Sequence, residues 1–232
     1  MASNLTDRHD GVWIVMAAYN EGEVIAGVVR PLVESHYQVV VVDDGSRDAT
    51  AERARAAGAA VVRHPINRGQ GAALQSGLRY ALRHGARILV TFDADGQHAA
   101  DDISRLVGPI AGGTADIVLG SRFIEHAADV PATRRLLLRL AVAFTGVVSG
   151  IRLTDAHNGL RALSRRAAEQ VDLQLDRMAH ASEIIDQLVR TGLPLVEVSV
   201  TVRYTPYSLR KGQRAGHAAR IVWDYLLNKV SR

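Results

Sequence analysis

Apolar and polar positions follow a repeating pattern over the first half of the chain. Short apolar runs, typical of buried strands, alternate with stretches in which apolar residues recur three and four positions apart, as on one face of a helix. Strands are predicted at residues 12–18, 39–42, 59–62, 88–92 and 116–119, and helices at 24–33, 49–57, 72–83 and about 101–110. This alternation with short connections predicts a parallel sheet covered by helices on both faces.

Polar residues follow the predicted strands at their carboxyl ends. They are Asn20 and Glu21, Asp43 and Asp44, Asn67 and Arg68, Asp93 and Asp95, and Ser121 and Arg122. In a parallel α/β sheet these ends lie along one edge, and ligands bind there. One such group is an ordinary turn, but five groups along one edge predict a binding site.

The chemistry of this edge depends most on Asp93 and Asp95, which end the fourth predicted strand and are followed by Gln97 and His98. The chain bends at a strand end, so the two carboxylates need not point to opposite faces. Together they suit a hard divalent cation that also holds phosphate oxygens. The alternative is a solvated turn, because Asp and Gly are ordinary turn residues. A calcium-binding EF-hand is disfavoured, since Ser104 stands where its loop needs a glutamate.

The composition excludes several classes of site. The chain has 232 residues, 47% of them hydrophobic, and no cysteine, so it can form a sizeable core but no disulfide or thiolate site. The net charge of +4 suits phosphate-bearing ligands or an anionic membrane, and is too small to indicate nucleic-acid binding. Residues 17–21, after the first strand, contain no glycine, which argues against a dinucleotide cofactor. The remaining pattern suits a nucleoside diphosphate bridged to the protein by a metal ion.

The alternation ends after residue 122. A basic and then strongly apolar helix is predicted at residues 131–149, another helix at 182–191, an edge-type strand at 195–204 and an amphipathic helix at 212–232. The longest apolar run, residues 140–151, is too short to span a bilayer. The two basic helices, the first with Arg134, Arg135 and Arg139, suit an anionic membrane surface, although a core helix with a solvated face has the same pattern.

Five motifs occur in order along the chain. They are Ala-Tyr-Asn-Glu at residues 18–21, Val-Asp-Asp-Gly-Ser-Arg-Asp-Ala-Thr at 42–50, Asn-Arg-Gly-Gln-Gly at 67–71, Asp-Ala-Asp-Gly-Gln-His at 93–98 and Gly-Ser-Arg at 120–122. The chain thus resembles family 2 glycosyltransferases with the GT-A fold, and is most similar to the polyprenol-phosphate sugar transferases of the dolichol-phosphate mannose synthase group. The resemblance covers about residues 14–211. It implies an α/β architecture with a Rossmann-like, mostly parallel sheet flanked by helices, in a single domain with a C-terminal acceptor subregion.

The resemblance also implies roles for particular residues. The implied nucleotide site consists of Ala18, Tyr19, Glu21, Asp43, Gly71, Asp93 and Ala94, with Asp43 as the contact to the base. The implied metal site holds Mg²⁺ or Mn²⁺ through Asp93, Asp95 and Gln97. The expected catalytic residues are Asp95, Arg122 and Asp155. The residues expected to face the acceptor phosphate are Arg122, Arg134 and Lys211.

Two segments depart from the family pattern. Segment 154–161 keeps the Asp, Gly and Arg positions but has His157 and Asn158 between them, and segment 204–212 only loosely resembles the acceptor loop of the mannose synthases. Asp155 is interpreted equally well as a structural cap or a site carboxylate, and Glu183 as a charge at a helix start. A phosphate acceptor is already ionised at neutral pH, whereas a hydroxyl acceptor would need a base, for which Asp155 and Glu183 are candidates.

The sequence therefore predicts an inverting, metal-dependent glycosyltransferase. The expected donor is a nucleoside-diphosphate sugar, GDP-mannose or a UDP-sugar. The expected acceptor is a polyprenyl phosphate, dolichyl or undecaprenyl, at the cytoplasmic face of the membrane. The alternatives are a saccharide or small-molecule hydroxyl acceptor in cell-wall or polysaccharide synthesis, and a non-catalytic sugar-nucleotide-binding module that serves a membrane partner. No nucleic-acid partner is expected.

The expected organisation has three parts. Residues 1–10 are predicted to form a flexible N-terminus, 11–211 the GT-A domain and 212–232 the terminal helix. Within the domain, residues 11–122 form the nucleotide-sugar half and 123–211 the acceptor half. Relatives with long membrane-spanning tails differ from this sequence, which ends at Arg232. A lipid acceptor is therefore expected to be reached by a peripheral protein from the membrane surface, or through a separate membrane partner.

Overall fold

A sheet of seven strands forms the centre of the protein. The strands are β1 (Val12–Ala18), β2 (Gln38–Asp43), β3 (Ala60–Arg63), β4 (Ile88–Thr91), β5 (Ile117–Ser121), β6 (Arg161–Ser164) and β7 (Leu195–Ser199). The helices are α2 (Ile25–Glu34), α3 (Thr50–Ala56), α4 (Gln70–Arg83), α5 (Ile103–Ala111), α7 (Arg165–Ala168) and α8 (His180–Arg190), with a short 3₁₀ helix η1 (Ala100–Asp102). The computed structural model describes residues 9–124, 153–155, 158–174, 180–203 and 207.

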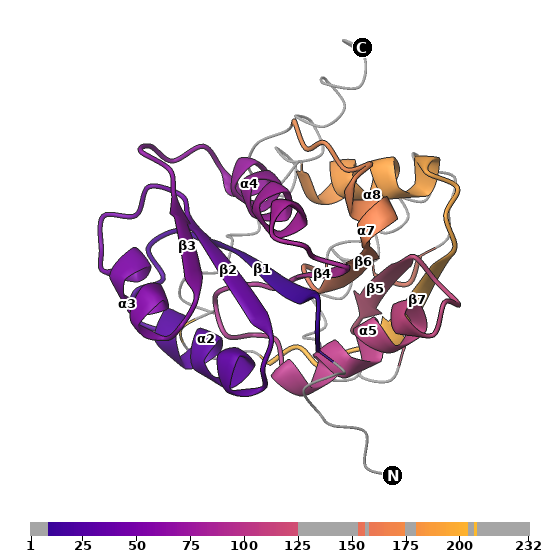
Figure 1. Ribbon diagram of the computed structural model, residues 1–232, viewed down its shortest axis with the longest axis horizontal. Helices are drawn as coiled ribbons and strands as arrows, with labels where there is room; N and C mark the ends of the chain where they lie inside the picture. The colour runs from indigo at the N-terminus through magenta and orange to yellow at the C-terminus, as the bar shows by residue number, and fades with distance from the viewer. Residues whose placement is uncertain (1–8, 125–152, 156–157, 175–179, 204–206, 208–232) are drawn as a thin grey trace.

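The strands lie in the order β3-β2-β1-β4-β6-β5-β7, and helices cover both faces of the sheet. Helices α2, α3 and α5 pack on one face, and α4, α7 and α8 pack on the other (Figure 1). Each face has its own buried apolar cluster. The expected α/β architecture with a mostly parallel sheet is confirmed.

The central strands are apolar throughout because both of their faces are covered. In β1, Ile14 and Met16 belong to the cluster beneath α2 and α5, whereas Trp13 and Val15 belong to the cluster beneath α4. This alternation is the two-residue period of a strand. Every strand and helix predicted before residue 122 is present, with its ends within two residues of the prediction.

Strand β6 was not predicted, and it lies antiparallel between β4 and β5. It has only four residues, the first of them a charged arginine, so it forms no apolar run long enough to indicate a strand. Because β6 runs against both neighbours, β4 and β5 are parallel to each other. The carboxyl ends of β1, β2, β4 and β5 therefore share one edge with the amino end of β6, and this places residues 158–161 at the predicted site.

Strand β7 lies at the end of the sheet and pairs in parallel with β5, so the predicted edge position is confirmed. The strand ends at Ser199, earlier than the predicted residue 204. The predicted helices at 131–149 and 212–232, with Arg134 and Lys211, lie outside the described residues. Among the residues that the structure describes, no helix is long and apolar enough to cross a membrane.

Candidate active site

The polar groups that follow the strands lie along one edge of the sheet, as predicted. Ala18, the last residue of β1, pairs with Asp43, the last residue of β2, and the next backbone N–H, that of Asp44, donates to the Ala18 carbonyl at 2.9 Å. Gly71 lies in the first turn of α4. Tyr19 is 40% exposed at this edge, whereas Ala18 and Ala94 are buried. The nucleotide roles of these residues remain predictions.

The loops after β1 and β2 are joined by hydrogen bonds from backbone to side chain. Asn20 has a positive φ of 53°, which asparagine tolerates better than most residues. Its N–H donates to Ser46 Oγ at 2.9 Å, and its own Oδ1 accepts the Arg47 N–H at 2.9 Å. The Glu21 N–H donates to Thr50 Oγ1 at 2.9 Å. The motifs at 18–21 and 42–50 therefore form one structural unit.

The Asp43 carboxylate is fully buried behind Arg63. Its Oδ1 accepts the Ser46 N–H at 2.9 Å, and its Oδ2 lies 3.2 Å from Arg63 Nε. Half of the Arg63 side chain is exposed, and it forms part of the wall of an open pocket of about 310 Å³. The other lining residues are Gly45, Ser46, His64 and Pro65. A direct contact between Asp43 and a base would require the Arg63 guanidinium to move, so this contact stays a prediction.

Asp44 holds the loop that follows β3. Its carboxylate accepts the N–H groups of Arg68 at 2.9 Å and Gly69 at 2.7 Å, and it bonds His64 Nδ1 at 2.7 Å. A Cβ added to Gly45 would lie 2.7 Å from the Asn67 nitrogen, so only glycine permits this approach of the two loops. These contacts explain locally why the motifs at 42–50 and 67–71 occur together.

The Asp93 carboxylate lies among positively charged or ionisable groups. His98 Nε2 is 2.9 Å from Asp93 Oδ2, and 32% of the Asp93 side chain is exposed. Burial alone would raise the Asp93 pKa, but the hydrogen bond to His98 and the charges of His98, Arg161 and His180 lower it below its usual value. A Cβ on Gly159 would lie 2.3 Å from Asp93 Oδ2. Glycine at 159 therefore allows the loop before β6 to reach Asp93.

Asp95 has the opposite electrostatic environment. Burial and the negative charge of Asp93 raise the pKa of Asp95, and the charge of Glu21 raises it further. The Gln97 N–H, which donates to Asp95 Oδ1 at 3.0 Å, and the charge of His98 oppose this rise. A divalent cation would relieve the repulsion between the two carboxylates, and carboxylate and amide oxygens are ligands that Mg²⁺ and Mn²⁺ accept. The residues present therefore fit the predicted ion.

The protein supplies only part of such a metal site. No group of three or more His, Cys, Asp or Glu side chains suited to a metal ion occurs within the described part of the chain. An ion held by Asp93 and Asp95 would therefore depend on Gln97 and on phosphate oxygens of a bound nucleotide for further ligands. Mg²⁺ is commonly bound in this way, through one or two carboxylates and substrate phosphates.

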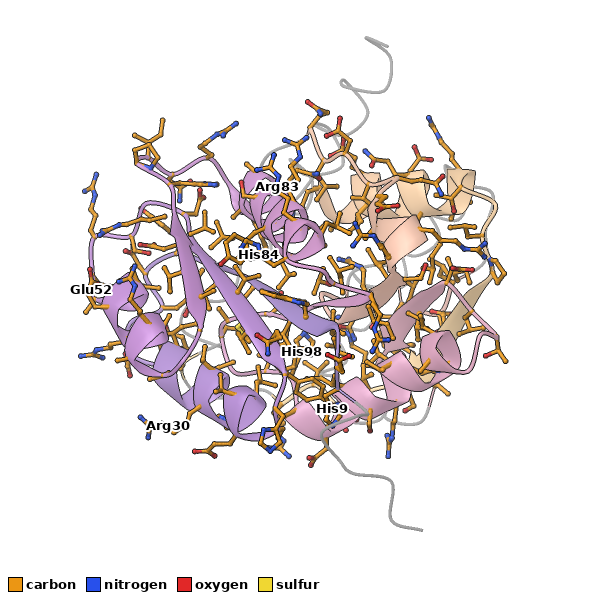
Figure 2. The ribbon with its side chains drawn as sticks, viewed as in Figure 1. His9, Arg30, Glu52, Arg83, His84 and His98 are labelled. Atoms are coloured by element: carbon orange, nitrogen blue, oxygen red, sulfur yellow. The ribbon has the colours of Figure 1, made fainter. Side chains whose placement is uncertain are left out.

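Arg161 and His180 are buried beside the carboxylates, and sequence reasoning did not assign a role to either. Arg161 is 2% exposed; burial lowers its pKa to about 10, while the charges of Asp93 and Asp155 oppose that shift. His180 begins α8 and is buried, and its charge contributes to the low pKa of Asp93. Figure 2 shows His98 within the fold, whereas Arg30 and Glu52 point outward from α2 and α3. A single histidine at a helix start gives no sequence signal for such a position.

Arg122 and Asp155 form a buried ion pair. Arg122 Nε donates to Asp155 Oδ2 at 2.6 Å, and the Arg122 backbone N–H reaches the same oxygen at 3.2 Å. Only 8% of the Arg122 side chain and none of the Asp155 side chain is exposed. The structure thus brings two of the predicted catalytic residues together. Asp155 is engaged with an arginine at this edge, and its role as a site carboxylate or a structural cap stays a prediction.

Two residues after β7, Arg203 and Tyr207, contact the site edge. The Arg203 N–H donates to the Gln97 carbonyl at 2.8 Å. Further along, Tyr207 Oη donates to Glu21 Oε2 at 2.7 Å. Burial, together with the hydrogen bond to Glu21, raises the pKa of Tyr207. The Tyr207–Glu21 contact joins residues 186 positions apart, and Arg203 and Gln97 are also distant in the sequence, so no local pattern could have predicted these contacts.

Comparisons with known proteins agree with this geometry. The family model described as "Glycosyl transferase family 2" matches residues 13–172. An uncharacterized protein of Methanocaldococcus jannaschii is 35% identical over 95% of this chain and 93% of its own length. The UDP-N-acetylglucosamine–dolichyl-phosphate N-acetylglucosaminyltransferase of Methanococcus voltae is 32% identical over 95% of this chain and 97% of its own length.

A solved structure shows the same fold. The glucosyl-3-phosphoglycerate synthase of Mycobacterium tuberculosis, in complex with Mn²⁺, uridine diphosphate and phosphoglyceric acid, superposes with a TM-score of 0.69 and 24% identity. The match covers 98% of this chain and 83% of that chain. At this identity the likeness concerns the fold alone, and it confirms the expected GT-A architecture.

Proposed function

The chain belongs to glycosyl transferase family 2, and from this premise we propose that it transfers a sugar from a nucleoside-diphosphate sugar to a polyprenyl phosphate. One observation carries the proposal. The Asp93 and Asp95 carboxylates follow β4, whose last residue pairs with Arg161, at the edge of the sheet. The charge of Arg161 acts on Asp93, and that of Glu21 acts on Asp95. The site thus has acidic groups for a metal-bound diphosphate beside arginines for a second anion.

The metal role follows from the charge of the leaving group. Asp93, Asp95 and Gln97 would hold Mg²⁺ or Mn²⁺, and the bound ion supplies neutralisation of the charge that develops on the leaving diphosphate. The protein's own contribution is to fix the two carboxylates. His98 and the close approach of Gly159 orient Asp93, and the Gln97 N–H orients Asp95.

A phosphate acceptor suits the groups around the site better than a hydroxyl acceptor does. Asp155, one of the two candidate bases, is buried and paired with Arg122. Glu183, the other, is also buried, and it accepts the Gln174 N–H at 3.1 Å and the Gln187 side-chain amide at 3.3 Å. Both carboxylates already have strong partners. An ionised phosphate needs no proton removed, because its oxygen can attack the anomeric carbon directly.

The proposed reaction is a single displacement with inversion. A phosphate oxygen of the acceptor forms a bond to the anomeric carbon as the bond from that carbon to the nucleoside diphosphate breaks, and the electron pair leaves with the diphosphate. The similarity to the Methanococcus voltae transferase, whose acceptor is dolichyl phosphate, supports a lipid phosphate acceptor. We propose that the protein meets this lipid at the cytoplasmic membrane surface, as the basic helices predicted from the sequence suggest.

The test is an assay with purified protein, undecaprenyl or dolichyl phosphate, and a panel of labelled UDP- and GDP-sugars. We expect label in the lipid fraction with Mg²⁺ or Mn²⁺ and none after chelation with EDTA. Saccharide acceptors, offered in parallel, should remain unlabelled. Transfer to a saccharide hydroxyl without transfer to the lipid phosphate would contradict the proposal.

A further inference from the structure

Glu197, on the edge strand β7, holds the turn that carries Asp155. Its Oε1 accepts the Thr154 N–H at 3.0 Å, the Thr154 hydroxyl at 2.9 Å and the Asp155 N–H at 3.2 Å. Its Oε2 lies 2.9 Å from the Thr154 nitrogen. A carboxylate that accepts two consecutive backbone N–H groups and a hydroxyl fixes the position of that turn relative to the sheet.

The Thr154 hydroxyl extends this network to β5. Thr154 Oγ1 lies 2.6 Å from Ser121 Oγ. An ionised carboxylate only accepts hydrogen bonds, so the Thr154 hydroxyl proton is directed to Glu197, and the Ser121 hydroxyl must donate to Thr154. Ser121 Oγ in turn accepts the Phe123 N–H at 3.2 Å. This chain of donors runs from Phe123 to Glu197 and fixes the residues on both sides of Arg122.

A second path from Glu197 also ends at Arg122. The Asp155 N–H donates to Glu197, and the Asp155 carboxylate accepts the Arg122 side chain at 2.6 Å and its backbone N–H at 3.2 Å. The backbone around Arg122 and the Arg122 guanidinium are therefore both held by groups that Glu197 positions. Glu197 lies 43 positions after Thr154 and 42 positions after Asp155 in the sequence.

We propose that Glu197 is a positioning residue for Arg122, acting through Thr154 and Asp155, and that it thereby sets the affinity of the site for the acceptor anion. The inference rests on the proposed function, in which that anion is a lipid phosphate. In this proposal Glu197 acts through Thr154 and Asp155 and does not itself bind a substrate. Its network reaches the residues on both sides of Arg122, whereas the hydrogen bonds that join the loops after β1 and β2 involve other groups. Loss of Glu197 should therefore affect the acceptor more than the donor.

The test compares Thr154→Val and Glu197→Gln with the wild-type protein. Thr154→Val removes the hydroxyl that joins Ser121 to Glu197 but keeps both backbone N–H donors, so it probes the network even if Glu197→Gln fails to fold. Thr154→Ser restores the hydroxyl. Glu169→Gln is the matched control, because Glu169 is half exposed and pairs with Arg165 at 2.8 Å within one helical turn.

We expect Glu197→Gln and Thr154→Val to raise the KM for polyprenyl phosphate about tenfold or more, the scale of losing a hydrogen bond to a charged group. The KM for the sugar nucleotide should change less than about twofold, within the effect of a neutral surface change. Thr154→Ser and Glu169→Gln should behave like the wild type. A purely structural role would lower the melting temperature and raise both KM values together.

Two results would overturn the proposal. One is an unchanged acceptor KM in both test variants, and the other is an equal rise in donor and acceptor KM. Failure of the proposed function is recognised separately, in the wild-type protein. If the wild type glycosylates another acceptor instead of polyprenyl phosphate, the proposed function is wrong, and the same comparison of KM values for that acceptor decides whether Glu197 positions Arg122.

Discussion

The proposed nucleotide side of the site, around Asp43, and the proposed acceptor side, around Arg122, hold their charges in different ways. On the nucleotide side, Asp43 is completely buried but its partner Arg63 keeps 51% of its side chain exposed. On the acceptor side, Arg122 and Asp155 are both buried, with 8% and 0% of their side chains exposed. Water can replace an exposed arginine, whereas the loss of one partner from a buried pair leaves the other charge uncompensated.

This difference separates adaptable from rigid parts of the site. Arg63 is half exposed, so water can take the place of its guanidinium when it moves away from Asp43, which suits a pocket wall that adjusts to a ligand. Arg122 is held by Asp155 and, through the hydrogen-bond network described above, by Glu197. Substitutions on the acceptor side should therefore reduce stability as well as activity, and substitutions on the nucleotide side should reduce binding with little effect on stability.

The largest effect on turnover is expected at Asp95, where the two sides meet. Asp95→Asn should lower turnover at least about a hundredfold, the scale of losing one electrostatic stabiliser of the transition state, and should abolish metal-dependent binding of the nucleoside diphosphate. Asp101→Asn, the same substitution at an exposed position, is the matched control. Near-normal, metal-dependent turnover in Asp95→Asn would remove Asp95 from the metal site.

Asp95→Asn should be no less stable than the wild-type protein at neutral pH. Burial and the charge of Asp93 raise the Asp95 pKa above its unfolded value. A carboxyl with a raised pKa contributes stability below its unfolded pKa and loses that contribution as the pH rises through the folded pKa. At pH 7 the charged form is the unfavourable one, so the neutral amide should leave the free energy of unfolding unchanged or slightly higher in urea denaturation.

The largest effect on stability is expected on the acceptor side. Asp155→Asn keeps the shape of the side chain but removes the negative charge that faces the buried Arg122 Nε. We expect the free energy of unfolding, measured with urea, to fall by about 3–5 kcal/mol. A loss below 1 kcal/mol would show that water reaches Arg122, and the contrast between the two sides would then be wrong.

A smaller effect is expected where the loop before β6 meets Asp93. A Cβ at residue 159 would lie 2.3 and 2.4 Å from the two Asp93 oxygens, so Gly159→Ala must displace the carboxylate. We expect a loss of about 1–3 kcal/mol in unfolding free energy, typical of overpacking, together with weaker metal-dependent nucleotide binding. Gly108→Ala is the control, since an added Cβ meets nothing within 4 Å there. Equal behaviour of the two variants would mean that Gly159 does not position Asp93.

The smallest effect on stability is expected at Arg63. Arg63→Gln removes a half-exposed partner, so the unfolding free energy should change by less than about 1 kcal/mol.

Asp43→Ala should weaken UDP or GDP binding about tenfold or more, the scale of losing a hydrogen bond to a charged group. Calorimetry would measure the affinity of both variants for UDP or GDP. Unchanged nucleotide affinity in Asp43→Ala would place the base elsewhere.

The first half of the fold could be predicted from local pattern. The valines of β2 form an apolar run bounded by polar residues, and helices such as α4 have apolar positions at helical spacing. Strand β6 could not be predicted in this way. It is four residues long, and its first residue is Arg161, which is buried because its partners come from other loops.

The placement of the predicted site residues along one edge could be predicted, whereas their pairings could not. The position of Asp93 and Asp95 at a strand end and the shared edge of the sheet followed from the alternation of elements. The pairing of Arg122 with Asp155, 33 positions apart, depends on the chain before β6, and the engagement of Glu197 and Tyr207 depends on residues in and after β7. Periodicity carries no information about such contacts.

In the proposed function, the site at the carboxyl edge of the sheet transfers a sugar to a phosphate oxygen. The most direct measurement offers the wild-type protein polyprenyl phosphate and, in parallel, the polyprenol of the same chain length, with one labelled sugar nucleotide and Mg²⁺ or Mn²⁺. We expect a metal-dependent sugar-phosphate-lipid product, identified by mass spectrometry, and no glycosylated polyprenol. Equal glycosylation of the free polyprenol would contradict the proposed function, because it would show that the site activates a hydroxyl and does not select a phosphate.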